Sequence, residues 1–142
     1  LHDRPSLTTL AATRSAASQA YAQSGYAASD LDVVEVHDCF TVAELLATED
    51  LGLTDRGQGG VFARDGEGRR NEGHTTVNGS GGLKAKGHPL GATGAGQAVE
   101  VFKQLRGDAG PRQVRDAEVG LTHNVGGSGA TCAVHVFGRS PE

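Results

Sequence analysis

The sequence predicts an α/β domain in which helices cover a mixed β-sheet. Three observations carry this prediction: helical spacing alternates with short β-branched runs, the helical segments are rich in alanine, and the last two apolar runs flank a glycine-rich turn. Alanine-rich faces let helices pack closely on a sheet, and two strands joined by a short turn pair antiparallel. The 142 residues suffice for one domain with a hydrophobic core.

The first half of the chain is predicted to form a helix, a strand and a second helix. Ser6–Ser24 has roughly helical spacing of its larger side chains, and Gly25 follows it as a stop. Leu31–Val36 is short and β-branched, which is typical of a strand. Phe40–Leu51 returns to helical spacing, and Gly52 ends it.

The second half is predicted to form a long surface excursion, a helix and a β-hairpin. Gly52–Gly82 has little periodicity, so we expect an excursion with room for a short helical turn. Ala92–Arg106 is predicted as a helix. Its apolar stripe consists of Ala92, Ala95, Val99 and Phe102. Glu118–Thr122 and Thr131–Phe137 are predicted strands, joined by the turn His123–Ala130.

Composition argues against several classes of partner. The net charge is −4 and the 13 Lys and Arg residues are scattered, which does not fit nucleic-acid binding. No apolar run approaches the ~20 residues of a membrane span. Cys39 and Cys132 lie far apart, so no disulfide framework is expected, and no His/Cys spacing fits a metal site. We therefore expect a cytoplasmic protein without a bound metal.

The chain contains no methionine, and Leu1–Pro5 reads as part of a running segment. We expect the second half of a longer polypeptide. A separately encoded subunit that lost its initiator is the alternative.

The segment Gly87–Gly94, GHPLGATG, holds His88 between two residues that restrict the backbone. Imidazole is the side chain that ordinarily titrates nearest neutrality, so a rigidly presented His88 is suited to act as a base. A Gly-Pro turn that happens to contain a histidine is the alternative interpretation.

The segment His37-Asp38-Cys39-Phe40 follows directly on the predicted strand 31–36. Strand side chains alternate, so His37 and Cys39 should share a face. Chemistry in α/β sheets gathers at the carboxyl ends of strands, where a thiol near imidazoles is suited to proton transfer. Alternatively, Cys39 is a small buried apolar residue.

The segment His123–Gly127, HNVGG, offers a third set of groups. Glycines let the backbone present consecutive N–H donors to an oxyanion, although a hairpin turn that needs glycine explains them equally. Gly91–Gly96 does not fit a dinucleotide-binding motif, because no strand precedes it.

Together, GHPLGATG, HDCF and HNVGG resemble the C-terminal half of thiolases, closest to the sterol-carrier-protein-type thiolases and related bacterial and archaeal thiolase-like proteins. The resemblance runs from Asp3 to Phe137. It implies a thiolase-type layered domain over residues 1–142. It also implies that the N-terminal half, which carries the nucleophilic cysteine of thiolases, lies outside this chain.

The resemblance implies roles for individual residues. His88 matches the histidine that activates the nucleophilic cysteine and helps to hold the thioester oxygen. His37 stands where most thiolases have an asparagine that orders water in an oxyanion hole. His123 stands where most carry a second catalytic cysteine, a departure offset in the sterol-carrier-type subgroup by the HDCF cysteine, here Cys39. The corresponding backbone donors are Gly126 and Gly127.

These roles imply an acyl-CoA thiolase that cleaves 3-ketoacyl-CoA or forms it by Claisen condensation. Coenzyme A would be substrate and product, with no permanently bound cofactor, and the partners would be the N-terminal half and a second subunit or more. The alternatives are a retro-aldolase acting on a β-hydroxyacyl-CoA, such as a steroid side chain, and a non-catalytic assembly subunit. We expect the three motifs to converge on one cleft. We also expect exposed apolar surface around it and around the excursion.

Overall fold

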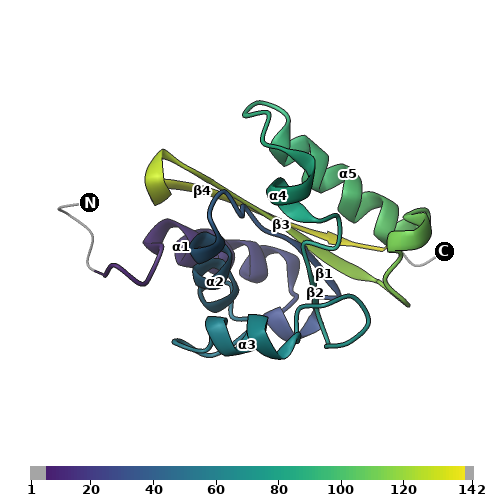
Figure 1. Cartoon of the computed structure of the whole chain (residues 1–142), viewed down its shortest axis with the longest axis horizontal. Helices are drawn as coiled ribbons and strands as arrows, with labels where there is room; N and C mark the ends of the chain where they lie inside the picture. Colours follow the sequence, from purple (N-terminus) through teal and green to yellow (C-terminus); the bar gives the residue numbers. More distant parts are fainter. Residues whose placement is uncertain (1–5, 140–142) are drawn as a thin grey trace.

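The computed structural model describes residues 6–139 and shows a four-stranded sheet with helices on both faces (Figure 1). Leu1–Pro5, the expected running segment, lies outside the described residues. The strand order is β2-β1-β3-β4. The strands are β1 (Val33–Glu35), β2 (Thr76–Val77), β3 (Val119–Gly126) and β4 (Thr131–Gly138). Within residues 6–139, no helix combines the length and apolarity that a membrane span needs.

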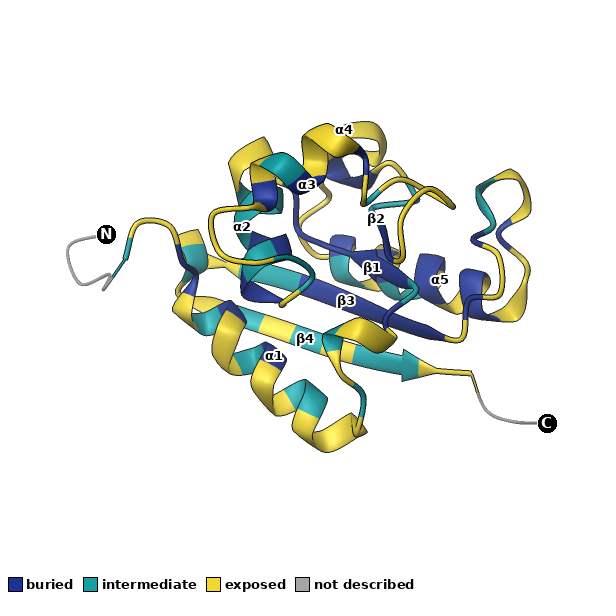
Figure 2. Cartoon of the chain, turned by 90° about the horizontal axis from the view of Figure 1, so that it is seen from below, coloured by how far each residue is buried: buried dark blue, intermediate teal, exposed yellow. Residues whose placement is uncertain are grey.

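The sheet is mixed, as predicted. Strand β1 runs parallel to β2 and β3, whereas β3 and β4 form an antiparallel hairpin. Strands β1 and β3 are largely buried in the middle of the sheet, and β4 lies at its edge (Figure 2). The prediction of a turn from His123 was wrong, because β3 continues to Gly126 in register with β4 and the short helix η3 (Gly127–Gly129) makes the turn.

One face of the sheet packs on α1 (Ala11–Ser24) and α2 (Thr41–Asp50). The core on this face is apolar. It comprises Ala17, Leu31, Val34, Val36, Ala47, Leu51, Val119 and Leu121. Helix α1 begins at Ala11 rather than at Ser6, because the Leu10 N–H donates to the buried Asp50 carboxylate at 2.6 Å and holds the chain extended there.

The other face packs on α5 (Thr93–Arg106). The side of α5 that faces the sheet is not the apolar stripe that the sequence predicts. The predicted stripe is exposed: Val99 and Phe102 are 52% and 57% accessible. The inward residues are Thr93, Gln97, Glu100, Val101, Gln104 and Leu105. The inward polar side chains have hydrogen-bond partners. Gln97 and Gln104 bond backbone groups, and the Glu100 carboxylate accepts from Arg112.

The predicted excursion contains more regular structure than its sequence indicates. It forms α3 (Gly59–Asp65), the edge strand β2 and the start of α4 (Gly82–Lys86). Two further short helices, η1 (Ala28–Asp30) and η2 (Gly110–Arg112), lie in connections. Strand β2 escapes prediction because two paired residues are too few to show a periodicity.

His123 is completely buried and links three elements through one hydrogen-bonded chain. Its Nδ1 accepts the His37 N–H at 3.4 Å, so its Nε2 carries the proton and faces the Thr13 hydroxyl at 3.0 Å. That hydroxyl donates to Cys132 Sγ at 3.6 Å. Burial, and then the charge of His37, lowers the pKa of His123 from 6.5 to about 4. The ring is therefore neutral at pH 7.

We predict that Gly120→Ala destabilises the domain, because a β-carbon there would overlap the Val101 side chain of α5. Overpacking of this kind typically costs about 1–3 kcal/mol of unfolding free energy. Gly96→Ala is the matched control: nothing lies within 4 Å of its added β-carbon, and alanine favours a helix by up to ~1 kcal/mol over glycine. Urea unfolding should separate the two variants, and equal midpoints would refute the close contact.

We predict that His123 makes the fold sensitive to mild acid. Its folded pKa lies below the unfolded value, so its contribution to stability is complete above pH 6.5 and is lost as the pH falls toward about 4. The free energy of unfolding, measured by urea titration, should therefore fall less steeply with decreasing pH in His123→Gln than in the parent. The difference between the two slopes should be up to about 1.4 kcal/mol per pH unit. His135→Gln, at an exposed position of β4, is the control. An unchanged slope in His123→Gln would contradict the assignment.

Candidate active site

Two histidines meet at the carboxyl end of β1. The ring centroids of His37 and His88 are 4.8 Å apart and the ring planes are nearly perpendicular, at 84°. His37 is buried and His88 is exposed, so His88 is the ring of the pair that a ligand can reach. The predicted convergence of the HDCF and GHP histidines is thus present in the structure.

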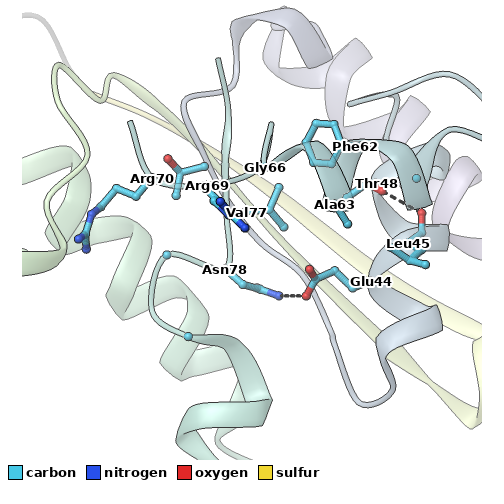
Figure 3. Close-up of a pocket in the computed structure, with 15 residues that line it drawn as sticks. Glu44, Leu45, Thr48, Phe62, Ala63, Gly66, Arg69, Arg70, Val77 and Asn78 are labelled. Carbon is cyan, nitrogen blue, oxygen red and sulfur yellow. Dashed lines mark hydrogen bonds between the residues drawn. The ribbon is translucent and has the colours of Figure 1, made fainter. Parts of the chain in front are cut away.

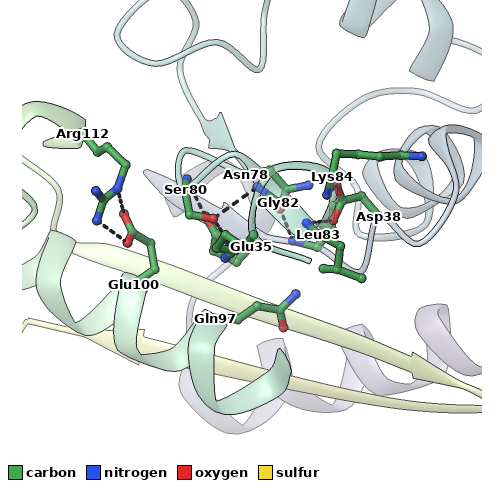
Figure 4. Close-up of polar contacts among 12 residues, drawn as sticks. Glu35, Asp38, Asn78, Ser80, Gly82, Leu83, Lys84, Gln97, Glu100 and Arg112 are labelled. Carbon is green, nitrogen blue, oxygen red and sulfur yellow. Dashed lines mark hydrogen bonds and ion pairs between the residues drawn. The ribbon is translucent and has the colours of Figure 1, made fainter. Parts of the chain in front are cut away.

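Hydrogen bonds to Asp38 hold the start of α4, the helix that precedes His88 in the sequence. The buried Asp38 carboxylate accepts the backbone N–H groups of Leu83 at 2.7 Å and Lys84 at 3.4 Å (Figure 4). A β-carbon at Gly82 would overlap this carboxylate. Side chain and backbone therefore meet closely, and a glycine is required at that point.

Glu35, the last residue of β1, holds the segments before and at the end of α4. Its fully buried carboxylate accepts the Ser80 hydroxyl at 2.5 Å and the Ser80 N–H at 3.1 Å (Figure 4). It also pairs with the Lys86 ammonium at 3.1 Å. Lys86 precedes His88 by two residues. Glu35 and Asp38 thus hold both ends of α4, and with them the approach to His88.

Thr93 sets the protonation of the His88 ring. The Thr93 hydroxyl lies 2.7 Å from His88 Nδ1 and donates its single proton to the Pro89 carbonyl at 3.2 Å. In this arrangement Nδ1 carries a proton and donates to Thr93, which leaves the lone pair on Nε2. A neutral His88 therefore has the tautomer that an Nε2 base requires.

The two cysteines have different surroundings. Cys39 is exposed, just before α2, so the alternative of a buried apolar residue is wrong. Within residues 6–139 no hydrogen bond joins the Cys39 thiol to either histidine ring. Cys132 is half-buried in β4, and burial raises the pKa of its thiol. Cys39 is thus the thiol that a bound ligand could reach beside the histidines.

From β3, the side chain on the α5 side of the sheet is Asn124, whereas the His123 ring lies on the other side and bonds the His37 backbone N–H. Neighbouring residues of a strand point to opposite faces, so the His123 ring lies against α1 while Asn124 lies on the α5 side. The Asn124 amide donates to Gln97. Strand alternation would have found Asn124 had the length of β3 been known from the sequence.

The environment of His37 favours a neutral ring. Desolvation by burial, followed by the nearby His88, lowers the pKa of His37, and Asn124 and Asp38 oppose that shift. The Nδ1 atom of His37 is buried and has no hydrogen-bond partner among the described residues.

Gly126 and Gly127 lie at the exposed end of the hairpin. Gly127 has a φ of +56°, and the Gly126 carbonyl accepts the Ala130 N–H at 3.1 Å. Among the described residues, no hydrogen bond connects these glycines with His37 or His88, and their role as oxyanion donors stays a prediction.

Exposed apolar side chains flank the histidines as predicted. Phe40 is 70% and Leu90 83% accessible, and they follow Cys39 and His88 respectively in the sequence. The expectation of a similar surface on the excursion was wrong, because no large apolar side chain described between residues 52 and 82 is exposed.

A cavity of about 340 Å³ lies beside the site, between α2, α3 and β2 (Figure 3). On one wall Asn78 donates to the Glu44 carboxylate at 2.9 Å, and burial raises the pKa of Glu44. Neither histidine of the pair lines this cavity.

Comparisons with known proteins agree with the motifs. Residues 1–139 match the family described as thiolase C-terminal domain-like. The chain is 55% identical over 139 residues to the acetyl-CoA acetyltransferase of Methanothermobacter thermautotrophicus, covering 98% of this chain and 36% of that protein. It is 41% identical to the acetyl-CoA acetyltransferase of Methanocaldococcus jannaschii, covering 96% and 36%.

Two further matches extend this result. Sterol carrier protein 2 of Rattus norvegicus is 51% identical over 118 residues, covering 83% of this chain and 21% of that protein. A solved structure titled Ltp2-ChsH2(DUF35) aldolase shares the fold with a TM-score of 0.81, 24% identity, and coverage of 97% of this chain and 35% of that one. The chain thus spans about a third or less of the matched proteins. By sequence and by fold, it belongs to the thiolase C-terminal domain-like family.

Proposed function

We propose that this chain supplies one half of an active site for acyl transfer at coenzyme A thioesters, namely cleavage of 3-ketoacyl-CoA or its formation by Claisen condensation. The observation that carries the proposal is the contact of His37 and His88 at the end of β1, with the exposed Cys39 thiol two residues from His37. The identity to two proteins named acetyl-CoA acetyltransferase supports this reaction class.

The first step needs a base, and His88 provides it. The Nε2 lone pair of His88 accepts the proton of a cysteine thiol contributed by the N-terminal half. The thiolate then attacks the thioester carbonyl of acyl-CoA, the C–S bond to coenzyme A breaks, and the imidazolium returns its proton to the departing coenzyme A thiolate. An acyl-enzyme thioester remains. His37 lies beside His88, where negative charge develops on the carbonyl oxygen.

The second step moves a proton at carbon, and Cys39 provides the group. In condensation the Cys39 thiolate removes the α-proton of acetyl-CoA, and the resulting enolate attacks the acyl-enzyme carbonyl and displaces the enzyme thiolate. In cleavage the same thiol protonates the acetyl-CoA enolate that leaves. Coenzyme A is substrate and product throughout. On this proposal the assembly is a cytoplasmic homodimer or larger homo-oligomer.

The two alternatives have less support. A retro-aldolase would use the same histidines without a cysteine nucleophile, but the aldolase match at 24% identity shows the fold alone. A non-catalytic assembly subunit leaves unexplained why the His88 and His37 rings meet and why the Thr93 hydroxyl lies at His88 Nδ1.

We predict different defects for variants of the complete protein. His88→Ala should abolish acyl-enzyme formation, because a general base typically contributes ~100- to 10,000-fold. Cys39→Ala should still form the acyl-enzyme but not turn it over, leaving an adduct that intact-mass spectrometry detects. Cys132→Ala is the matched cysteine control and should behave like the parent. A normal rate in Cys39→Ala together with a dead Cys132→Ala would show that the wrong thiol was chosen.

We predict that Thr93→Val slows acyl-enzyme formation by roughly 100-fold. Without the hydroxyl, the proton of the neutral His88 ring can move from Nδ1 to Nε2, and Nε2 then no longer has the lone pair that a base needs. Thr93→Ser keeps the hydroxyl and should restore most of the rate. Pre-steady-state release of coenzyme A measures the step. Equal rates in the valine and serine variants would remove the tautomer argument.

A further inference from the structure

We propose that Asn78 is a positioning residue whose side chain holds both ends of the segment His37–Phe40 and thereby fixes where the Cys39 thiol lies in the active site. The inference rests on the proposed function for its purpose, and its evidence is a set of hydrogen bonds outside the histidine pair. Asn78 directly follows the short strand β2 and lines the cavity between α2, α3 and β2 (Figure 3).

The Asn78 amide bridges the two stretches of chain that flank the segment. Its Oδ1 accepts the backbone N–H of Val36, just before His37, at 2.9 Å. Its Nδ2 donates at 2.9 Å to the carboxylate of Glu44, in the first turn of α2 (Figure 3). A backbone N–H can only donate, so the amide oxygen must face Val36 and the NH₂ group must face Glu44. These two hydrogen bonds together are the Asn78 bridge.

The backbone of Asn78 is fixed independently of its side chain. Its N–H donates to the Val34 carbonyl of β1 at 2.8 Å, and its carbonyl accepts the N–H of Gly81, immediately before α4, at 2.8 Å. Its φ is +50°, a left-handed conformation that asparagine tolerates better than most residues do. The backbone thus leads toward α4 and His88, whereas the side chain acts on the segment that carries Cys39. Glycine at this position would keep the backbone conformation and remove the bridge.

Cys39 depends on its neighbours for its position. In the described part of the chain, neither the thiol nor the backbone of Cys39 makes a hydrogen bond. On its N-terminal side, the Asp38 carboxylate is bonded to the start of α4. On its C-terminal side, the Phe40 carbonyl accepts N–H groups from the first turn of α2 at 2.9 and 3.4 Å, and the Glu44 side chain extends from that turn to Asn78. The Asn78 bridge therefore ties this C-terminal side to the end of β1.

Asn71 is a matched control in the same chain. It also has a left-handed backbone, with a φ of +61°, and its Oδ1 accepts the backbone N–H of the distant Arg115 at 3.0 Å. Arg115 precedes β3 whereas His37 follows β1, and these strands run parallel, so Asn71 contacts the opposite end of the sheet from the histidines. Asn78→Gly and Asn71→Gly each remove one amide that accepts a distant backbone N–H, at a position where glycine fits.

The first test is hydrogen exchange of the peptide covering residues 37–44 in the complete protein. A hydrogen bond of ordinary strength corresponds to roughly a fivefold change in a local opening equilibrium. We expect Asn78→Gly to speed exchange in this peptide by about that factor and Asn71→Gly to leave it unchanged. Equal exchange of the peptide in the two variants would overturn the Asn78 bridge.

The second test exchanges donor and acceptor between the two side chains. Asn78→Asp alone places a second carboxylate against Glu44 and should speed the exchange more than Asn78→Gly does. Glu44→Gln alone keeps an acceptor for Asn78 and should resemble the parent. The double variant Asn78→Asp with Glu44→Gln keeps the net charge and lets an amide at position 44 donate to a carboxylate at position 78, so it should restore slow exchange. A double variant no better than Asn78→Asp would refute the bond as the element that holds the segment.

In acyl transfer, the two half-reactions should respond differently to Asn78→Gly. Turnover of the acyl-enzyme, which uses Cys39, should slow roughly tenfold or more, because misplacing a reacting group by about 1 Å can cost ~100-fold. Formation of the acyl-enzyme, which uses His88, should stay close to the parent rate. Equal losses in both steps would indicate a general loss of structure and overturn the positioning role.

The exchange measurements need no turnover. A complete protein that shows the expected exchange pattern but transfers no acyl group would refute the proposed function and leave the Asn78 bridge standing.

Discussion

The buried carboxylates at the end of β1 organise the rest of the site. Glu35 ends β1 and Asp38 follows three residues later, and between them they hold Ser80, both ends of α4 and Lys86. A buried carboxylate is costly unless its oxygens are paired, so these contacts and the placement of His88 depend on one another. The segment from Glu35 to Asp38 thus carries His37 and also positions His88.

Polar groups share with Val101 and Leu105 the face by which α5 packs on the sheet. Gln97, Glu100 and Gln104 point inward and each finds a partner, while Val99 and Phe102 remain outside. A hydrogen bond between a side-chain amide and a backbone group fixes the orientation of the amide, whereas an apolar contact has no such directional requirement. The first turn of the same helix supplies Thr93 to His88, so the packing of α5 and the protonation of the site are set by one element.

Sequence reasoning reached the fold class, the mixed sheet and the motifs whose histidines meet, because glycine, proline and β-branched runs report local backbone directly. It failed where tertiary contacts decide. The length of β3 depends on its register with β4, the inward face of α5 on partners that lie elsewhere in the chain, and the two-residue β2 on its pairing with β1. Asn124 went unnoticed for the same reason, since its direction follows from the strand that contains it.

The central claim is that acyl transfer takes place over the His37–His88 pair. A crystal structure of the complete protein with bound acyl-CoA tests it most directly. The account predicts the sulfur of the nucleophilic cysteine at hydrogen-bond distance from His88 Nε2 and next to the thioester carbonyl carbon, with the Cys39 sulfur facing the α-carbon. A thioester seated instead in the cavity between α2, α3 and β2, out of reach of both histidines, would contradict it.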